Sequence, residues 1–317
     1  TAAEVLGNIE AMSWAVRHAA ADEPFTINRL AAVHARLLAG TRMDSHAGRV
    51  RTEQNWIGGS GYNPCGAAFV PPPPEHVLPL LEDLCTFCNS DGLPAVAQAA
   101  IAHAQFETIH PFADGNGRTG RALIHMVLRR RGLTPRVLPP VSLILATRSS
   151  EYIEALIGTR HIGPPDTAQV HAGANRWIAQ FAAACRQAAQ DAMRFEARIR
   201  DIQERWRAQA GKVRAGSATE RLIRTLPGSP VVTVASARAI SGRNFAATNN
   251  AIRRLLDAGV LTQITVGRRN RAFEAADIVD AFTDLERGLA SPEWDTRLAD
   301  PVRAVPRRRR AAEPRRG

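Results

Sequence analysis

The segment from His110 to Arg121 constrains this chain more than any other. It reads H-P-F-A-D-G-N-G-R-T-G-R and lies between two helix-patterned, apolar stretches at 94–109 and 117–131. Proline disfavours the α conformation of the residue before it, so Pro111 predicts the end of the first helix. The second helix is expected to begin at Gly117 or the next residue. The segment therefore predicts two helices joined by a sharp, glycine-rich turn.

This turn is suited to bind an anion. Glycine reaches positive φ, so the run Gly115, Asn116 and Gly117 can direct backbone N–H groups toward a ligand. The N-terminus of the following helix adds unpaired N–H groups and the positive end of its macrodipole. Arg118 and Arg121 are three residues apart and share one face of that first turn. Two guanidiniums there oppose the helix dipole unless an anion compensates them, which predicts a phosphate site.

Single features of this kind are weak evidence. A glycine-rich turn before a helix often binds nothing, and a His-Pro pair can be merely a helix stop. The combination of an imidazole, a carboxylate, a glycine-rich turn and paired arginines at fixed spacing favours a nucleotide polyphosphate with a divalent metal.

The segment matches in full the H-P-F-x-[DE]-G-N-G-R-x-x-R signature of the Fic family, whose members mostly transfer AMP from ATP to protein hydroxyl groups. The resemblance covers roughly residues 1–185. Residues 102–121 are similar to the two central helices and the active-site loop of that family, and residues 48–58 and 68–73 resemble its flap. The resemblance implies transfer of AMP to a Ser, Thr or Tyr hydroxyl group of a protein, with release of pyrophosphate.

The matching positions imply specific roles. His110 would be the general base, since an imidazole with its ordinary pKa of about 6.5 suits proton abstraction at neutral pH. Asp114 would hold Mg²⁺ against the α- and β-phosphates, as a hard oxygen ligand for a hard ion. Asn116 and the neighbouring glycine amides would stabilise the charge that develops as pyrophosphate leaves. By resemblance, Arg118 holds the β-phosphate and Arg121 the γ-phosphate.

Further ligand contacts are expected around this core. Tyr152 lies where the family places an aromatic ring against adenine, although Ile153 replaces a second tyrosine and a packing role for Tyr152 is the alternative. His103 precedes His110 by two helical turns and is interpreted as a packed or capping histidine. The complete set of predicted nucleotide-binding residues is Gly115, Asn116, Gly117, Arg118, Thr119, Gly120, Arg121, Tyr152, Gln54 and Asn55.

The expected flap, about residues 49–73, contains two short strand-like runs at 52–57 and 67–70. Turn residues separate them, which predicts a β-hairpin, and Pro71 to Pro74 give it a rigid, extended exit. The free edge of such a hairpin can align an acceptor segment by strand addition. An ordinary surface hairpin is the alternative.

Helical periodicity dominates the chain up to about Ala210, with further helices expected at 27–39, 74–89, 149–159 and 168–209. We therefore expect a mainly α fold: a Fic-type helical bundle with a β-hairpin flap, then a small α+β winged-helix domain and a disordered basic tail. The expected boundaries are 1–185 for the catalytic domain, 186–216 for a helical linker, 217–284 for the winged helix and 285–317 for the tail.

The region 217–284 resembles a winged helix because a helix at 218–226 precedes a helix–turn–helix and two strands around a basic tip. Arginines gather on its second helix and wing, as DNA phosphate contacts would require: Arg243, Arg253, Arg254, Arg268, Arg269 and Arg271. Winged helices also bind proteins, so the partner of this region stays open between DNA and protein.

Charge and composition set further bounds. The chain has 41 Lys and Arg against 30 Asp and Glu, a formal net charge of +11, much of it in the Arg-rich tail. Such a tail would attract polyanions without specificity. No apolar run approaches membrane-spanning length and no signal peptide is visible at the start. Cys85 and Cys88 form a C-x-x-C within an apolar helical stretch, where core packing is the default. A cytoplasmic enzyme is expected, acting on protein substrates or itself, with a homodimer as one expected assembly.

Three functions stay open: a protein adenylyltransferase, a nucleotide-sensing, DNA-binding transcription regulator, and a Fic-fold enzyme that transfers another phosphate-containing group. Many relatives carry an inhibitory helix with S/T-x-x-x-E-G/N, whose glutamate pairs with the second motif arginine. No such string precedes His110, and the chain starts without Met. An N-terminal truncation is therefore expected, which would leave Arg121 without its restraining partner and strengthen self-modification.

Overall fold

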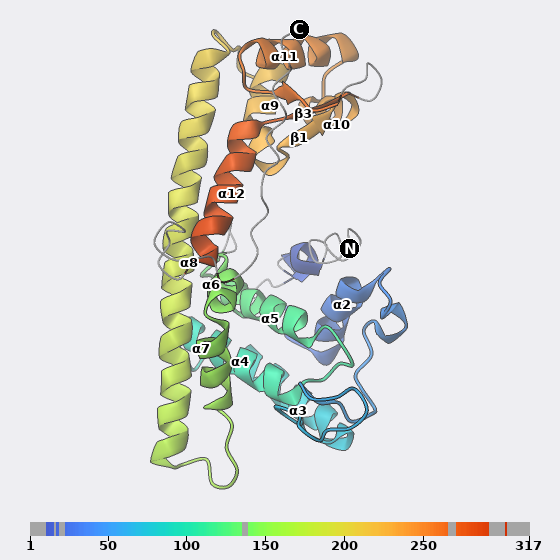
Figure 1. Cartoon of the computed structure of the whole chain (residues 1–317), viewed down its shortest axis with the longest axis vertical. Coiled ribbons are helices and arrows are strands. Elements are labelled where there is room, and N and C mark those ends of the chain that lie inside the picture. Colours follow the sequence, from blue (N-terminus) through green and yellow to red (C-terminus); the bar gives the residue numbers. More distant parts are fainter. Residues whose placement is uncertain are drawn as a thin grey trace. The chain divides into compact units, whose positions relative to one another are not determined.

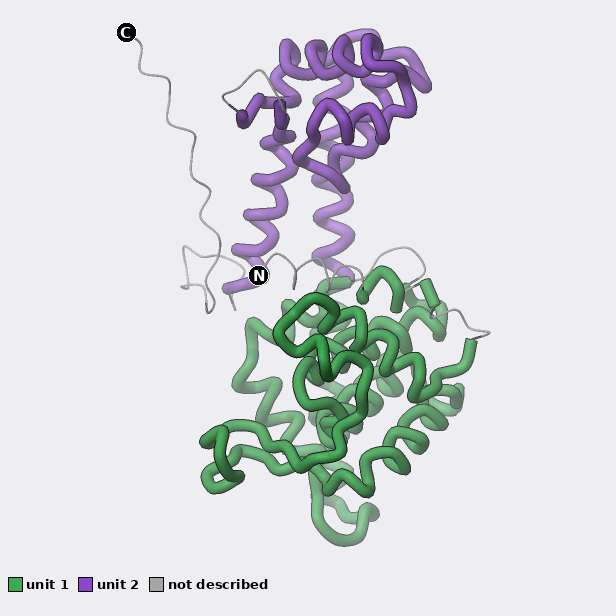
Figure 2. Tube along the Cα trace, turned by 90° about the vertical axis from the view of Figure 1, so that its right-hand side faces the viewer, with its two compact units in different colours: residues 1–188 green, residues 189–317 purple. Residues whose placement is uncertain are grey.

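The computed structural model describes residues 11–15, 17–18, 23–134, 139–265, 271–291 and 302. The chain divides into two compact units, residues 1–188 (unit 1) and residues 189–317 (unit 2), which Figure 2 shows in different colours. Two predicted features lie outside the described residues: the tip of the wing with Arg268 and Arg269, and the tail beyond Ser291 apart from Val302.

Unit 1 is built of helices (Figure 1). They are α2 (Ile27–Leu38), the 3-10 helix η1 (Asp44–His46), α3 (Pro74–Asn89), α4 (Ala95–Ile109), α5 (Asn116–Arg130), α6 (Val141–Thr147), α7 (Ser149–Ile157) and the first part of α8 (Ala168–Gln209). The predicted helices agree with these to within two residues at each end. α6 was not predicted, because this short helix lacks a clear period.

Helices α4 and α5 lie side by side at the centre of unit 1 (Figure 1). Alanine dominates α4 and favours helix formation, while small side chains such as Ala100 allow neighbouring helices to approach. Buried side chains of both helices, including Phe106 and Leu123, form the core. The turn between them therefore starts and ends on packed helices, which hold it in place.

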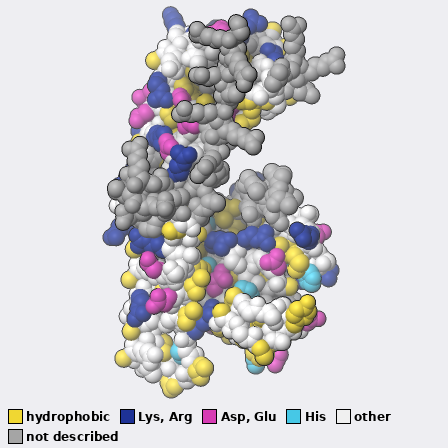
Figure 3. Space-filling view, in the orientation of Figure 1, with side chains coloured by type: hydrophobic (Ala, Val, Ile, Leu, Met, Phe, Trp, Pro, Cys, Tyr) yellow, Lys and Arg dark blue, Asp and Glu magenta, His cyan; other side chains and the backbone are white. Residues whose placement is uncertain are grey.

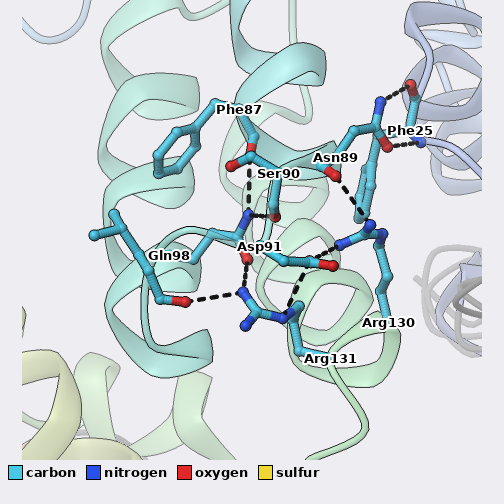
Figure 4. Close-up of polar contacts among 9 residues, drawn as sticks. Phe25, Phe87, Asn89, Ser90, Asp91, Gln98, Arg130 and Arg131 are labelled. Carbon is cyan, nitrogen blue, oxygen red and sulfur yellow. Dashed lines mark hydrogen bonds and ion pairs between the residues drawn. The ribbon is translucent and has the colours of Figure 1, made fainter.

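A polar network joins the C-terminal end of α5 to its neighbours (Figure 4). Arg131 donates to Gln98 Oε1 at 2.7 Å, and Gln98 in turn donates to the carbonyls of Phe87 at 2.8 Å and Ser90 at 2.7 Å. Arg130 Nη1 pairs with Asp91 at 2.7 Å. The network fixes the end of α5 against the ends of α3 and α4.

The flap lacks the two predicted strands. The runs 52–57 and 67–70 meet in a single bridge between Ile57 and Phe69, in which Ile57 N donates to Phe69 O at 2.9 Å. Gly58 and Gly59 have φ of +77° and +72°, so the chain bends away directly after the bridge. The flap is thus a loop with one bridged pair rather than a hairpin.

Unit 2 combines helices with a three-stranded antiparallel sheet of order β1-β3-β2. Its elements are the second part of α8, α9 (Ala218–Thr225), the 3-10 helix η2 (Leu226–Gly228), β1 (Val231–Thr233), α10 (Val234–Ser241), α11 (Phe245–Asp257), β2 (Thr262–Gln263), β3 (Ala272–Glu274) and α12 (Ala276–Ala290). Trp206 of α8 is fully buried in the core of this unit, and its Nε1 donates to Asp277 of α12 at 2.9 Å.

Two sequence predictions for this unit differ from the structure. The first of the two strands predicted around the basic tip consists of only the two residues of β2, and a third strand, β1, completes the sheet by pairing with β3. Helix α12 continues to Ala290, so residues 285–290 belong to a helix and not to a disordered tail. The winged-helix interpretation stays a prediction.

No helix in the described part of the chain is both long and apolar enough to cross a membrane. The two cysteines of the C-x-x-C are buried in α3, and burial raises the pKa of the Cys85 thiol to about 11. Their interpretation as core residues is confirmed.

Candidate active site

His110 caps the C-terminus of α4 in a left-handed conformation, with φ of 48° and ψ of 59°. It is the only residue other than glycine with positive φ among those that the structure describes. Pro111 disfavours the α conformation of the residue before it. His110 therefore leaves the α region, but it takes the left-handed conformation and not the extended one that usually precedes proline. Such a conformation is costly for a residue with a side chain, so surrounding contacts must hold it.

Arg51 and Asn55 hold this turn from the flap. Arg51 is 7% exposed, and its Nε donates to the His110 carbonyl at 2.9 Å. Its cation therefore sits at the C-terminal end of α4, where the macrodipole favours positive charge. Asn55 Nδ2 donates to the Phe112 carbonyl at 3.0 Å. Sequence reasoning missed Arg51, because no local pattern links it to a turn 59 residues away.

The imidazole of His110 is half-buried in this setting. Burial is the main cause that lowers its pKa to about 4, and the cations of Arg51 and Arg160 act in the same direction. The Glu107 backbone and the carboxylate of Asp114 oppose the shift. The ring is therefore neutral near pH 7, which is the state that a general base requires.

The loop after His110 is closed by Asn116. Its Nδ2 donates to the Phe112 carbonyl at 2.7 Å, and its Oδ1 accepts from the Phe112 N–H at 2.9 Å. Asn116 is 3% exposed. Both ends of its amide are thus engaged with the backbone, and its expected part in stabilising the charge on the leaving pyrophosphate stays a prediction. Asn116 shapes the loop.

His34 of α2 supports the same loop from the other side. Its ring stacks on Phe112 with centroids 3.8 Å apart, and its Nδ1 accepts from the Gly48 N–H at 3.0 Å. The remaining ring nitrogen, Nε2, is therefore the donor to the Asp114 carbonyl at 2.9 Å. No sequence pattern pointed to His34, which lies 80 residues from Asp114.

The N-terminus of α5 presents unpaired donors. Gly115, with φ of 76°, precedes the first helical residue, Asn116, one residue earlier than predicted. Within the described residues, no side chain caps this end. The N–H groups of Asn116, Gly117 and Arg118 thus have no intrahelical acceptor, because they open the helix. This is the arrangement that binds anions.

Charged side chains surround this helix end. The guanidinium of Arg121 folds back over Gly117, where an added Cβ would lie 3.2 Å from its Nη1. Arg121 is exposed and forms no hydrogen bond or ion pair with any residue that the structure describes. Arg118 Nη2 lies 3.5 Å from Asp114 Oδ2. Figure 3 shows basic side chains gathered on the visible face of unit 1 over α5 and α2.

Three residues of the predicted ligand set make or face contacts within the protein, and their contact with a nucleotide stays a prediction. Thr119 is 1% exposed and its Oγ1 donates to the Gly115 carbonyl at 3.0 Å. Gly120 faces α4, where an added Cβ would collide with Glu107 Oε1. Gln54 Nε2 donates to the Pro71 carbonyl at 2.9 Å, within the flap. Thr119 and Gly120 lie on the packed side of α5. Successive residues of a helix are rotated by more than a quarter-turn, so these two face away from the exposed Arg121.

Tyr152 of α7 and His103 of α4 form a buried pair. His103 contacts the Gly120 carbonyl through Nδ1 at 3.1 Å, so Nδ1 carries the proton and Nε2 accepts from the Tyr152 hydroxyl at 2.9 Å. Burial lowers the pKa of His103 to about 4 and raises that of Tyr152. The interpretation of His103 as a packed histidine is confirmed. The hydroxyl of Tyr152 is engaged, and a contact of its ring with adenine stays a prediction.

Glu107 and Arg160 were not singled out from the sequence. Glu107 is 9% exposed, and its Oε1 has no hydrogen-bond partner within the described residues. Burial raises the pKa of Glu107 to about 7, although Arg121 and Arg160 oppose the shift. Arg160 lies with its Cζ 3.4 Å from the ring centroid of Phe69 in the flap.

No group of three or more His, Cys, Asp or Glu side chains in the described part of the chain is arranged to hold a metal ion. Asp114 is the carboxylate closest in sequence to the uncapped helix end, and its side chain is 52% exposed. One exposed carboxylate together with substrate phosphates is a common Mg²⁺ site. The residues present thus fit a divalent cation that arrives with a nucleotide.

The model of the Fic/DOC family matches residues 24–128, which include His34, the flap and the whole helix–turn–helix of the site. Residues 24–128 form a Fic domain. Curated relatives include the protein adenylyltransferase fic-1 of Caenorhabditis elegans, 34% identical over 133 residues, which are 41% of this chain and 23% of the relative. A probable protein adenylyltransferase of Aquifex aeolicus is 41% identical over 93 residues, 29% of this chain and 26% of the relative.

The chain thus spans about a quarter of the length of these curated relatives. Among solved structures, a Fic family protein from Desulfovibrio desulfuricans G20 aligns with 84% of this chain and 73% of its own, with 21% identity and a TM-score of 0.49. The Fic domain of this chain extends over α2 to α5, and the similarity to the adenylyltransferases is likewise confined to part of the chain.

Proposed function

We propose that the Fic domain transfers AMP from ATP to a hydroxyl group of a protein. One observation carries the proposal: a neutral imidazole, His110, lies on the turn that leads into an uncapped helix N-terminus bearing Arg118 and Arg121. A base and a polyphosphate site are thus brought together by one short segment. The curated relatives are named protein adenylyltransferases, which supports AMP as the transferred group.

The proposed reaction needs one bond to form and one to break. The acceptor oxygen bonds to the α-phosphorus of ATP while the bond from that phosphorus to the oxygen bridging to the β-phosphate breaks. Pyrophosphate leaves, and His110 takes the proton of the acceptor hydroxyl. The N–H groups at the start of α5 and the guanidiniums of Arg118 and Arg121 stabilise the charge on the phosphates.

Asp114 is the residue that would hold a divalent cation, which would neutralise phosphate charge when bound. Its Oδ1 accepts from the Gly115 N–H at 2.6 Å, so the carboxylate is oriented by its own turn. Its other oxygen, Oδ2, faces Arg118 at 3.5 Å, a distance long enough for the pair to separate when a cation arrives.

A labelling experiment tests this function. The full chain is incubated with Mg²⁺ and ATP labelled at the α or the γ position, and protein-bound label is measured in the wild type, His110→Ala and the exposed control His76→Ala. We expect α-label on the protein, lost by about a hundredfold or more only in His110→Ala. Label from the γ position alone would show transfer of a different phosphate group, and equal labelling in His110→Ala would contradict the proposed base.

A second candidate function, DNA binding, rests on α11 in unit 2. Ala246, Asn250 and Arg253 are exposed and recur at helical spacing, so they form one stripe. Asn and Arg are the side chains that read adenine and guanine edges in a major groove.

Other arginines predicted to contact phosphates are engaged within unit 2. Arg243 Nη2 donates to the Gly216 carbonyl at 2.7 Å, and Arg254 Nε donates to the Ala210 carbonyl at 2.8 Å. Arg268 and Arg269 lie outside the described residues.

Fluorescence polarisation of a labelled DNA duplex, measured against salt concentration, tests this second function. Arg253→Gln should weaken binding and reduce the salt slope by about one, whereas Arg224→Gln, an exposed arginine on α9, should act as an unchanged control. Absence of binding at low salt would sink the DNA hypothesis and favour a protein partner for unit 2.

A further inference from the structure

Arg160 links the part of the flap around Phe69 to the end of α4, in addition to the links that Arg51 and Asn55 make elsewhere in the flap. It follows α7, and its Cζ lies 3.4 Å from the centroid of the Phe69 ring. Its Nε donates to Thr108 Oγ1 at 3.4 Å. Thr108 precedes His110 by two residues on α4. Arg160 thus contacts the flap on one side and the helix that carries the proposed base on the other.

The carboxylate of Glu107 compensates the charge of Arg160. Burial lowers its pKa, and the nearby carboxylate of Glu107 opposes that shift. Glu107 reaches this position because Gly120 has no Cβ, which would otherwise collide with Oε1. The carboxylate therefore compensates the guanidinium across the space that Gly120 leaves, while the flat face of the guanidinium stays free to stack on Phe69.

The flap needs such a contact because little else holds its returning limb, residues 67–70. The limb meets the outgoing limb in the single bridge between Ile57 and Phe69. At the tip, Tyr62 is 96% exposed. By contrast, the outgoing limb is tied to the active-site turn through Arg51 and Asn55. The contact of Arg160 with the Phe69 ring holds the returning limb in a corresponding way.

We propose that Arg160 is a positioning residue that holds the Phe69 limb of the flap at a fixed distance from His110. An acceptor segment lying along the flap then presents its hydroxyl to the imidazole. The expected effect of Arg160 on AMP transfer rests on the proposed function, whereas its contacts with the flap and α4 do not depend on that function. Arg160 acts through the flap and is not assigned a contact with the reacting atoms.

Hydrogen exchange of the full chain tests the geometry without any activity. The amides of Ile57, Ala68 and Phe69, which donate within the bridge, are compared between the wild type, Arg160→Gln and Phe69→Leu. We expect both variants to exchange about three- to tenfold faster there, as loss of one such contact predicts. The double variant should be no faster than either single one, because one interaction is removed in all three. Phe69→Tyr keeps the ring and Arg42→Gln removes an exposed arginine elsewhere, so both should match the wild type.

Transfer of AMP tests the consequence. With α-labelled ATP, Arg160→Gln and Phe69→Leu should label protein about tenfold more slowly at an unchanged KM for ATP, and Phe69→Tyr should restore the rate. A rise in the KM for ATP that accounts for the loss would overturn the inference, since Arg160 would then hold the nucleotide. Unchanged exchange in Arg160→Gln, or faster exchange with an unchanged labelling rate, would overturn it as well. If the wild type transfers no AMP, the proposed function fails while exchange still decides whether Arg160 holds the flap.

Discussion

At its C-terminal end, α5 runs into the network of Figure 4, where Arg131 donates to Gln98, and Gln98 donates to two backbone carbonyls of α3 and its C-cap. At its N-terminal end, the same helix has no capping side chain within the described residues, and Arg121 has no partner there. At one end Arg131, Gln98 and two backbone carbonyls bond to one another, whereas the N–H groups and Arg121 at the other end are left for a ligand.

This difference shows that the unpaired groups are not a general property of the helix. The chain places a buried glutamine and an aspartate at one end of α5, where they satisfy arginines and carbonyls. At the other end it places glycines, which offer no side chain, together with Arg121, which has no partner among the described residues, and Arg118, which has only the 3.5 Å contact with Asp114. A donor that is left without a partner costs stability when it is buried, whereas one that faces solvent stays available to a ligand. The two ends therefore predict opposite responses to substitution.

The largest effect is expected where the N-terminal end is joined to the loop. Asn116→Ala removes both hydrogen bonds to the Phe112 backbone, so it should lower the free energy of unfolding by about 1–3 kcal/mol and AMP transfer by about a hundredfold. Thermal unfolding and α-label transfer measure the two. Asn116→Asp keeps the acceptor for the Phe112 N–H and should lie between; full activity of Asn116→Ala would refute the role of this side chain.

At the C-terminal end, substitution should cost stability alone. Gln98 is fully buried, and Gln98→Leu removes the hydrogen bonds that Gln98 donates to the carbonyls of Phe87 and Ser90 and the one that it accepts from Arg131. We expect the free energy of unfolding to fall by about 2 kcal/mol. The affinity of the folded protein for ATP, measured by calorimetry below the unfolding temperature, should not change. A weaker affinity would mean that the two ends of α5 are coupled.

The converse is expected for Arg121 at the N-terminal end. Arg121→Gln should weaken ATP binding about tenfold, since a charge-assisted hydrogen bond to phosphate contributes about 1.5 kcal/mol or more. Thermal stability should stay the same or rise, because the guanidinium opposes the helix dipole. A destabilised variant with normal ATP binding would instead show that Arg121 stabilises the fold and does not bind the nucleotide.

The smallest effect concerns pH. Because burial lowers the pKa of His110 to about 4, the base is already unprotonated at pH 6, and kcat/KM for ATP should change by less than about twofold between pH 6 and pH 8. A ring with its ordinary pKa of about 6.5 would give about a fourfold rise over the same range. Glu107 has a pKa of about 7 and titrates in this window, so Glu107→Gln should be measured in parallel. A fourfold rise in both proteins would contradict the shifted pKa of His110.

Helix positions in unit 1 were predictable because their causes are local. Pro94 precedes α4, Gly132 with φ of 76° follows α5, α4 is rich in alanine, and α5 has apolar periodicity. The flap strands were predicted wrongly for the opposite reason. Residues 52–57 have strand-like composition, but Gln54 and Asn55 turn their side chains onto distant carbonyls, and only the folded chain brings those carbonyls near.

The sequence by itself determined the turn between two helices, the glycines that open α5, and the arginines and histidine beside it, because each of these depends on residues only a few positions apart. Only the tertiary structure decided which polar groups stay available. Asn116, Thr119 and Gln54 belong to the expected ligand set, yet their side chains bond to the backbone, whereas Arg51 and Arg160 come from segments distant in the sequence. Whether a polar group faces a ligand or the protein depends on which partners packing brings within about 3 Å, and the local sequence does not contain that information.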